Sequence, residues 1–128
     1  MLNICFLSGD MSRTGGTERV LSIIANELSK QKNKFNIHIL SITNENNTSY
    51  FNLENEIKND RILKSKDVNF KKQYFQVVKG IRHYIKENNI DILIDVEVIA
   101  SLFSIPATRF TKTKLISWEH FNFYEDNG

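Results

Sequence analysis

Residues 2–17, LNICFLSGDMSRTGGT, decide the fold of this 128-residue chain. The first six are almost wholly apolar and end at a Ser-Gly-Asp turn, which is typical of a strand buried on both faces. After the pair Gly15-Gly16, apolar residues recur at helical spacing, at Val20, Leu21, Ile24 and Leu28. This spacing predicts an amphipathic helix from about 17 to 32 with Glu18 off its apolar stripe.

The rest of the chain continues the alternation of strand and helix. Alternating apolar and polar residues predict a strand at 35–42, and apolar runs predict strands at 91–96 and 114–118, with an edge strand around 61–63. Helical spacing predicts a helix at 70–89 and another at about 98–110 that bends or restarts near Pro106. This order predicts the α/β class: a parallel sheet with right-handed crossovers and helices on both faces.

Composition bounds the class of protein. A chain of 128 residues that is 41% hydrophobic can close one core, so residues 1–128 are expected to form a single domain. Its formal charge of +2 argues against a dedicated nucleic-acid binder. The single cysteine, Cys5, excludes a disulfide framework, and no apolar stretch approaches the length of a membrane span. We therefore expect a cytoplasmic protein.

The loop between the first strand and the first helix is a candidate anion site. In parallel α/β sheets ligands bind beyond the carboxyl ends of the strands, where the strand order reverses. Gly15 and Gly16 would let a ligand approach the backbone, and the free amides at the helix start favour a phosphate or diphosphate. Neither the dinucleotide nor the P-loop signature is met. The alternative is that the two glycines only form a tight turn onto the sheet.

The same rule selects side chains after the later strands. His120 follows the last strand among aromatic neighbours and could donate a hydrogen bond to a sugar hydroxyl or phosphate, or could simply pack. Four carboxylates, at Asp10, Asp95, Glu97 and Glu119, could approach the same crevice. They could serve in acid and base chemistry, but Asp95 or Glu97 could equally cap the following helix. We expect no metal site. His38 is expected in the sheet and His83 in solvent.

Two motifs together resemble a known family. The stretch SGDMSRTGGTERVL at 8–21, followed by IIANELSK at 23–30, looks like the opening of family 4 glycosyltransferases. The stretch LISWEHFN at 115–122 is similar to the strand ending in Trp-Glu-His in many of them. The resemblance spans essentially the whole chain, although its middle matches in the order of elements more than in residues. It implies the N-terminal, acceptor-side half of the two-domain GT-B fold, which is Rossmann-like.

The resemblance also implies roles for individual residues. In the family the glycine turn lies near the donor diphosphate, which places Gly15 and Gly16 there, and the later histidine contacts the transferred sugar, which makes His120 the catalytic candidate. Arg13, Thr17 and Glu97 are candidates for acceptor contacts on their position in the crevice. The family transfers sugars from UDP- or GDP-sugars with retention of configuration, and needs no metal or other cofactor.

A large departure limits what this chain would do alone. The family's second domain binds most of the nucleotide-sugar through a Glu-x7-Glu motif, and that motif is absent from residues 1–128. We therefore expect little sugar transfer by this chain, and substantial turnover would contradict the expectation. The acceptor would be a glycan or a lipid-linked molecule. A lipid-linked acceptor would place the enzyme peripherally at the cytoplasmic face of the membrane, with help from the basic residues Lys71, Lys72, Lys79, Arg82 and Lys86.

Two other functions stay open. The first is another GT-B enzyme, such as a sugar-nucleotide epimerase, which shares the crevice but not the acceptor. The second is a non-catalytic α/β binding or regulatory domain, in which the glycines form a turn and the aromatic tail forms an interface. The basic helix at 70–89 is likewise an ordinary solvated face unless it also exposes apolar residues.

Overall fold

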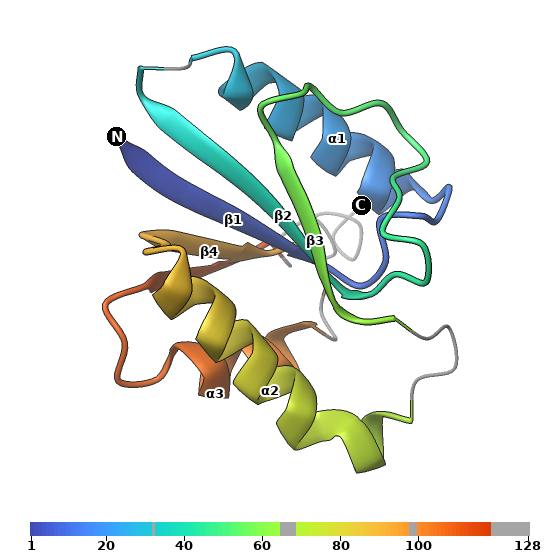
Figure 1. Cartoon of the computed structure of the whole chain (residues 1–128), viewed down its shortest axis with the longest axis vertical. Helices are drawn as coiled ribbons and strands as arrows, with labels where there is room; N and C mark the ends of the chain where they lie inside the picture. Colours follow the sequence, from blue (N-terminus) through green and yellow to red (C-terminus); the bar gives the residue numbers. More distant parts are fainter. Residues whose placement is uncertain (32, 65–68, 98–99, 119–128) are drawn as a thin grey trace, which may run out of the picture.

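A five-stranded parallel sheet forms the centre of the molecule (Figure 1). The computed structural model describes residues 1–31, 33–64, 69–97 and 100–118. The strands lie in the order β3-β2-β1-β4-β5, and every neighbouring pair is parallel. Their bounds are β1 Leu2–Ser8, β2 Phe35–Thr43, β3 Lys58–Leu63, β4 Ile92–Asp95 and β5 Lys114–Ser117. The chain order reverses between β1 and β4, so the ligand crevice of an α/β sheet is expected at their carboxyl ends.

Helices cover both faces of this sheet, as the α/β prediction requires (Figure 1). Helix α1, Gly16–Ser29, lies on one face over an apolar cluster that contains Ile4, Phe6 and Leu21. Helices α2, Phe70–Glu87, and α3, Ser101–Thr108, lie on the other face. The predicted α/β architecture is confirmed, and every expected element is present with its ends shifted by a few residues.

The buried side of α1 differs from the predicted stripe. Val20 is 42% exposed, although its position in the apolar repeat predicted burial. The helix instead buries Leu21 and Ala25 together with the polar side chains of Glu18 and Ser22. The helix is therefore rotated so that Glu18 points into the protein, and this rotation builds the site described below.

Of the bend or new helix predicted at Pro106, the new helix is wrong, because α3 continues through this residue. Proline has no N–H, so it cannot donate to the carbonyl of the residue four positions earlier, Leu102. The hydroxyl of Tyr74 on α2 donates to that carbonyl at 2.9 Å. A side chain of the neighbouring helix thus replaces the missing helical hydrogen bond.

Candidate functional site

The loop after β1 is fixed at the carboxyl edge of the sheet. Met11 is fully buried, and its N–H donates to the Ser41 hydroxyl at the end of β2. Asp10 accepts from both the backbone N–H of Ser12, at 2.9 Å, and its hydroxyl, at 2.6 Å. An aspartate that binds the backbone two residues on stabilises a tight turn. The carboxylate of Asp10 therefore shapes the loop.

Glu18 caps the start of α1 from inside the protein. Gly15 is the N-cap residue, with extended backbone, and its N–H donates to Glu18 Oε1 at 3.1 Å. A glutamate three residues after the N-cap that reaches back to the N-cap amide is half of a capping box. Because this buried carboxylate accepts from the Gly15 N–H, its negative charge lies close to the helix-start amides that were expected to attract an anion.

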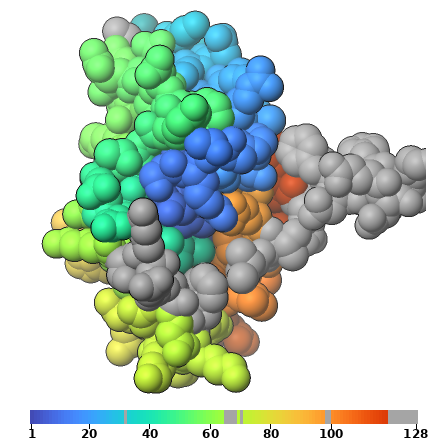
Figure 2. Space-filling view, turned by 90° about the vertical axis from the view of Figure 1, so that its right-hand side faces the viewer, coloured from blue at the N-terminus to red at the C-terminus, as the bar shows by residue number. Residues whose placement is uncertain are grey.

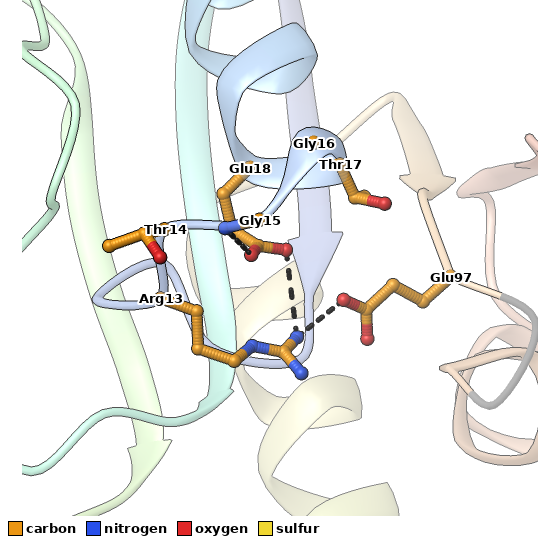
Figure 3. Close-up of a pocket in the computed structure, with 7 residues that line it drawn as sticks. All are labelled: Arg13, Thr14, Gly15, Gly16, Thr17, Glu18 and Glu97. Carbon is orange, nitrogen blue, oxygen red and sulfur yellow. Dashed lines mark hydrogen bonds and ion pairs between the residues drawn. The ribbon is translucent and has the colours of Figure 1, made fainter.

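Arg13 joins this helix start to the segment after β4 (Figure 3). Its guanidinium Nη2 forms an ion pair with Glu97 Oε1 and lies 3.7 Å from Glu18 Oε2. Its Nε also donates to the carbonyl of Asp10 at 3.3 Å. The ion pair joins residues 84 positions apart because β1 and β4 are neighbours, with Leu7 in register with Asp95.

These groups line an open hollow of about 580 Å³, which we call the glycine pocket. It is lined by Arg13, Thr14, Gly15, Gly16, Thr17, Glu18 and Glu97. Figure 2 views the molecule toward this side, where the loop after β1, in blue, meets the segment after β4, in orange. The structure thus gathers Gly15, Gly16, Arg13, Thr17 and Glu97 in one place, and the ligand role expected for each stays a prediction.

Gly16 leaves part of the pocket open. A Cβ built on Gly16 would meet nothing within 4 Å, and Gly16 has no positive φ. Neither the backbone nor the packing of the described residues therefore requires glycine at this position. A ligand that approaches the backbone closely would require it.

The charges of the pocket favour hydroxyl groups over a lone phosphate. Two carboxylates, of Glu18 and Glu97, surround one guanidinium, so the formal charge of the trio is negative. Burial raises the pKa of Glu97, Arg13 opposes this rise and Glu18 adds to it. Carboxylate oxygens accept hydrogen bonds from sugar hydroxyls, and a guanidinium donates to them. Because Gly15 already donates to Glu18, a diphosphate would depend on the backbone around Gly16.

Other predicted residues lie elsewhere. Asp95 is 1% exposed and accepts a hydrogen bond from the Ser104 hydroxyl at 2.7 Å inside the fold, so it neither lines the glycine pocket nor caps α3. His120 and Glu119 lie outside the described residues. His38 is buried in β2, and His83 is exposed and pairs with Glu87, as expected for both.

Two residues of the site were missed by sequence reasoning. Glu18 was placed on the polar side of the helix, although its position three residues after the N-cap Gly15 was a signal for a capping box. Gly9 was part of the loop but had no role. A Cβ on Gly9 would lie 2.6 Å from Nη2 of Arg13 and closer still to Glu97, so glycine at this position makes room for the ion pair.

Within the described ranges, no group of three His, Cys, Asp or Glu side chains is placed to hold a metal ion. None of the helices in the described part of the chain is long and apolar enough to cross a membrane.

Two known proteins that this chain resembles are named as glycosyltransferases. No protein-family model matches this sequence. A curated protein of Haemophilus influenzae, strain Rd, named an uncharacterized glycosyltransferase, is 34% identical over 123 residues, which are 96% of this chain and 33% of that protein. Among solved structures, the apo form of the lipopolysaccharide outer core galactosyltransferase WaaB matches with a TM-score of 0.71 and 21% identity, over 91% of this chain and 33% of that one. The chain thus spans about a third of each relative, and it shares the Rossmann-like α/β fold of part of a glycosyltransferase.

Proposed function

We propose that this chain is the acceptor-side, N-terminal domain of a retaining glycosyltransferase of family 4, with the GT-B fold. The observation that carries the proposal is the glycine pocket. It lies at the carboxyl edge where the strand order reverses, and Gly16 keeps its backbone open there although the fold does not require glycine. The 34% identity with the Haemophilus influenzae glycosyltransferase supports the same class.

In this proposal the pocket divides between donor and acceptor. The backbone around Gly15 and Gly16 approaches the diphosphate of a UDP- or GDP-sugar, which is the substrate, and no metal or other cofactor takes part. Arg13 and Glu97, held together by their ion pair, present a donor group and an acceptor group to sugar hydroxyls. Thr17 lines the same wall and offers a hydroxyl.

His120 completes the proposal as the catalytic residue that contacts the transferred sugar. The strand that precedes it, β5, is paired with β4, and Trp118 lies against Phe6 with ring centroids 6.5 Å apart. The segment that leads to His120 therefore starts at the carboxyl edge of the sheet. The acceptor is a glycan or a lipid-linked molecule of the cell envelope, and the enzyme acts in the cytoplasm or at the inner face of the membrane.

Titration calorimetry with UDP-glucose, UDP-galactose and GDP-mannose tests the donor class, with NAD⁺ as a dinucleotide of another class. We expect weak binding of at least one nucleotide-sugar, loss of that binding in Gly16→Val, and no loss in Glu27→Val, which adds the same side chain on the same helix at an exposed position outside the pocket. Equal binding of NAD⁺, or equal loss in both variants, would contradict the proposal.

A further inference from the structure

The long loop between β2 and β3, residues 44–57, is held in place at its start. The side chain of Asn44 is fully buried. Its amide donates to the Thr48 carbonyl at 2.7 Å, and its oxygen accepts from the Thr48 N–H at 3.1 Å. Nη1 of Arg61 on β3 donates to the carbonyls of Asn44 and Glu45, at 3.1 and 3.0 Å. The start of the loop is therefore closed into a turn that is held against β3.

The later part of the same loop is held against α1. The side-chain amide of Asn26 donates to the Asn52 carbonyl at 2.8 Å, and its oxygen accepts from the Glu54 N–H at 2.8 Å. The short stretch between the turn and these two hydrogen bonds, 49–51, is thus tethered on both sides. A side chain in this stretch is presented from a fixed backbone, which suits a ligand contact.

Tyr50 lies in the middle of this tethered stretch. Its N–H donates to the Met11 carbonyl at 3.1 Å, and its side chain is 64% exposed. The ring meets that of Phe51 at an interplanar angle of 83°, with centroids 5.0 Å apart. Single exposed aromatic rings are common on protein surfaces. Tyr50 differs from them in its fixed backbone and in its place.

The place of Tyr50 is the carboxyl edge of the sheet, beside the glycine pocket. β1 lies between β2 and β4, so the loop after β1 has the segment after β4 on one side and Tyr50 on the other. Figure 2 shows residues 44–57, in teal and green, next to the blue loop after β1. Met11 and Arg13 are two peptide bonds apart, which is at most about 7.6 Å between their Cα atoms. A ligand longer than one sugar ring would therefore reach from the pocket to Tyr50.

The side chains of this loop are polar without being basic. Residues 44–57 contain five asparagines, three glutamates and neither lysine nor arginine. Asn46, Thr48 and Asn52 are exposed. Amides and hydroxyls both donate to and accept from sugar hydroxyls, whereas carboxylates without a cation repel a phosphate. A tyrosine ring offers an apolar face to the C–H groups of a pyranose. This chemistry fits a neutral sugar and disfavours a nucleotide.

We propose that Tyr50 is a second sugar-binding position, which stacks on a neutral residue of the acceptor next to the residue held in the glycine pocket. The acceptor is then an oligosaccharide of at least two sugars. One sugar meets Arg13 and Glu97, and its neighbour meets Tyr50 and the polar side chains of its loop. This inference rests on the proposed function, in which the present domain is the acceptor side of the enzyme.

Titration of the whole chain with neutral saccharides, followed by nuclear magnetic resonance, tests the inference. The probes are glucose, galactose and mannose as single sugars, and maltose, lactose and α-mannobiose as disaccharides. We expect at least one disaccharide to bind about fivefold or more tightly than its component sugars, with shifts at the Tyr50 ring and at the amides of Arg13 and Glu97. Tyr50→Ala should remove this advantage, and Tyr50→Phe should keep it because the ring carries the contact.

The matched control is Phe75→Ala, which removes a ring that is 73% exposed on α2, outside the loop and the glycine pocket. It should leave disaccharide binding unchanged. Far-ultraviolet circular dichroism shows that each variant is folded. Absence of saccharide binding, an unchanged disaccharide advantage in Tyr50→Ala, or an equal loss in Phe75→Ala would overturn the inference.

UDP-glucose and GDP-mannose, titrated into the same variants, separate this inference from the proposed function. Nucleotide-sugar binding that Tyr50→Ala leaves intact, together with no disaccharide advantage, would leave the proposed function standing and overturn the role of Tyr50. A disaccharide advantage that depends on Tyr50, without any nucleotide-sugar binding, would support the sugar position and count against the proposed donor site. Loss of nucleotide-sugar binding in Tyr50→Ala would overturn the inference, because the ring would then serve the nucleotide.

Discussion

Gly16→Ala should stabilise the protein while weakening ligand binding. Gly16 is the first residue of α1, it has no positive φ, and a Cβ there would meet nothing within 4 Å. Glycine in a helix costs about 0.5–1 kcal/mol relative to alanine, and at the first position we expect about half of this, so the free energy of unfolding should rise by about 0.4 kcal/mol. With a urea dependence of about 2 kcal/mol per molar, the unfolding midpoint should rise by about 0.2 M.

The matched variant is Gly9→Ala, which should behave in the opposite way. Its Cβ would lie 2.6 Å from Nη2 of Arg13 and closer to Glu97, so the ion pair must move. Both atoms are the far ends of flexible side chains, so we expect a loss of no more than about 1 kcal/mol in the free energy of unfolding, which is the most that a half-exposed ion pair contributes. Urea unfolding followed by circular dichroism measures both variants, and calorimetry with the nucleotide-sugars measures binding. A large destabilisation by Gly16→Ala would show that glycine is needed for the fold, and unchanged binding would refute the role of Gly16 at the ligand.

Three further predictions concern stability. Burial of His38, with Lys58 adding to the effect, lowers the pKa of the imidazole to about 4. The contribution of His38 to stability should therefore be complete above pH 6.5 and fall by up to about 3 kcal/mol as the pH drops from 6.5 toward 4. The urea midpoint measured across this range should change less in His38→Gln, and an identical pH dependence in the two proteins would refute the assignment. Ser104→Ala should cost about 2 kcal/mol in urea unfolding, because it leaves the buried carboxylate of Asp95 without its hydroxyl donor, and a cost near zero would show that another group serves it. A double-mutant cycle of Arg13→Gln and Glu97→Gln should give a coupling of only about 0.5–1 kcal/mol, since the Arg13 side chain is 50% exposed, and no coupling would mean that the pair does not form in solution.

The elements of the fold could be predicted because burial sets their pattern. β1, β2 and β4 are paired on both sides. β1 and β4 were recognisable by nearly continuous apolar runs, and β2 by an alternation of apolar and polar residues that becomes apolar toward its end. Among the strands that the structure describes, β3 pairs with β2 alone, and its first residues, Lys58, Asn59 and Asp60, are polar. An edge strand needs no continuous apolar run, so only its last three residues were predicted.

The site was predictable as a place but not as a set of contacts. The rule for parallel sheets selected the loop after β1 and Glu97 after β4. Whether Arg13 meets Glu97 depends on the neighbour relation of β1 and β4, which sequence periodicity does not specify. The burial of Glu18 was missed because the buried side of a helix was predicted from its apolar residues alone. In the sequence, a buried glutamate that caps a helix cannot be told from a glutamate exposed to solvent.

Amide chemical shifts during a titration with UDP-glucose, UDP-galactose and GDP-mannose test the central claim most directly. They report separately on each residue of the chain. If the glycine pocket holds part of a nucleotide-sugar, the amides of residues 13–18 and of Glu97 should shift together with one affinity, and free glucose or inorganic phosphate should shift fewer of them. If none of these amides moves with any of the three nucleotide-sugars, or if the shifts fall elsewhere on the sheet, the claim that this pocket is the donor and acceptor site is wrong.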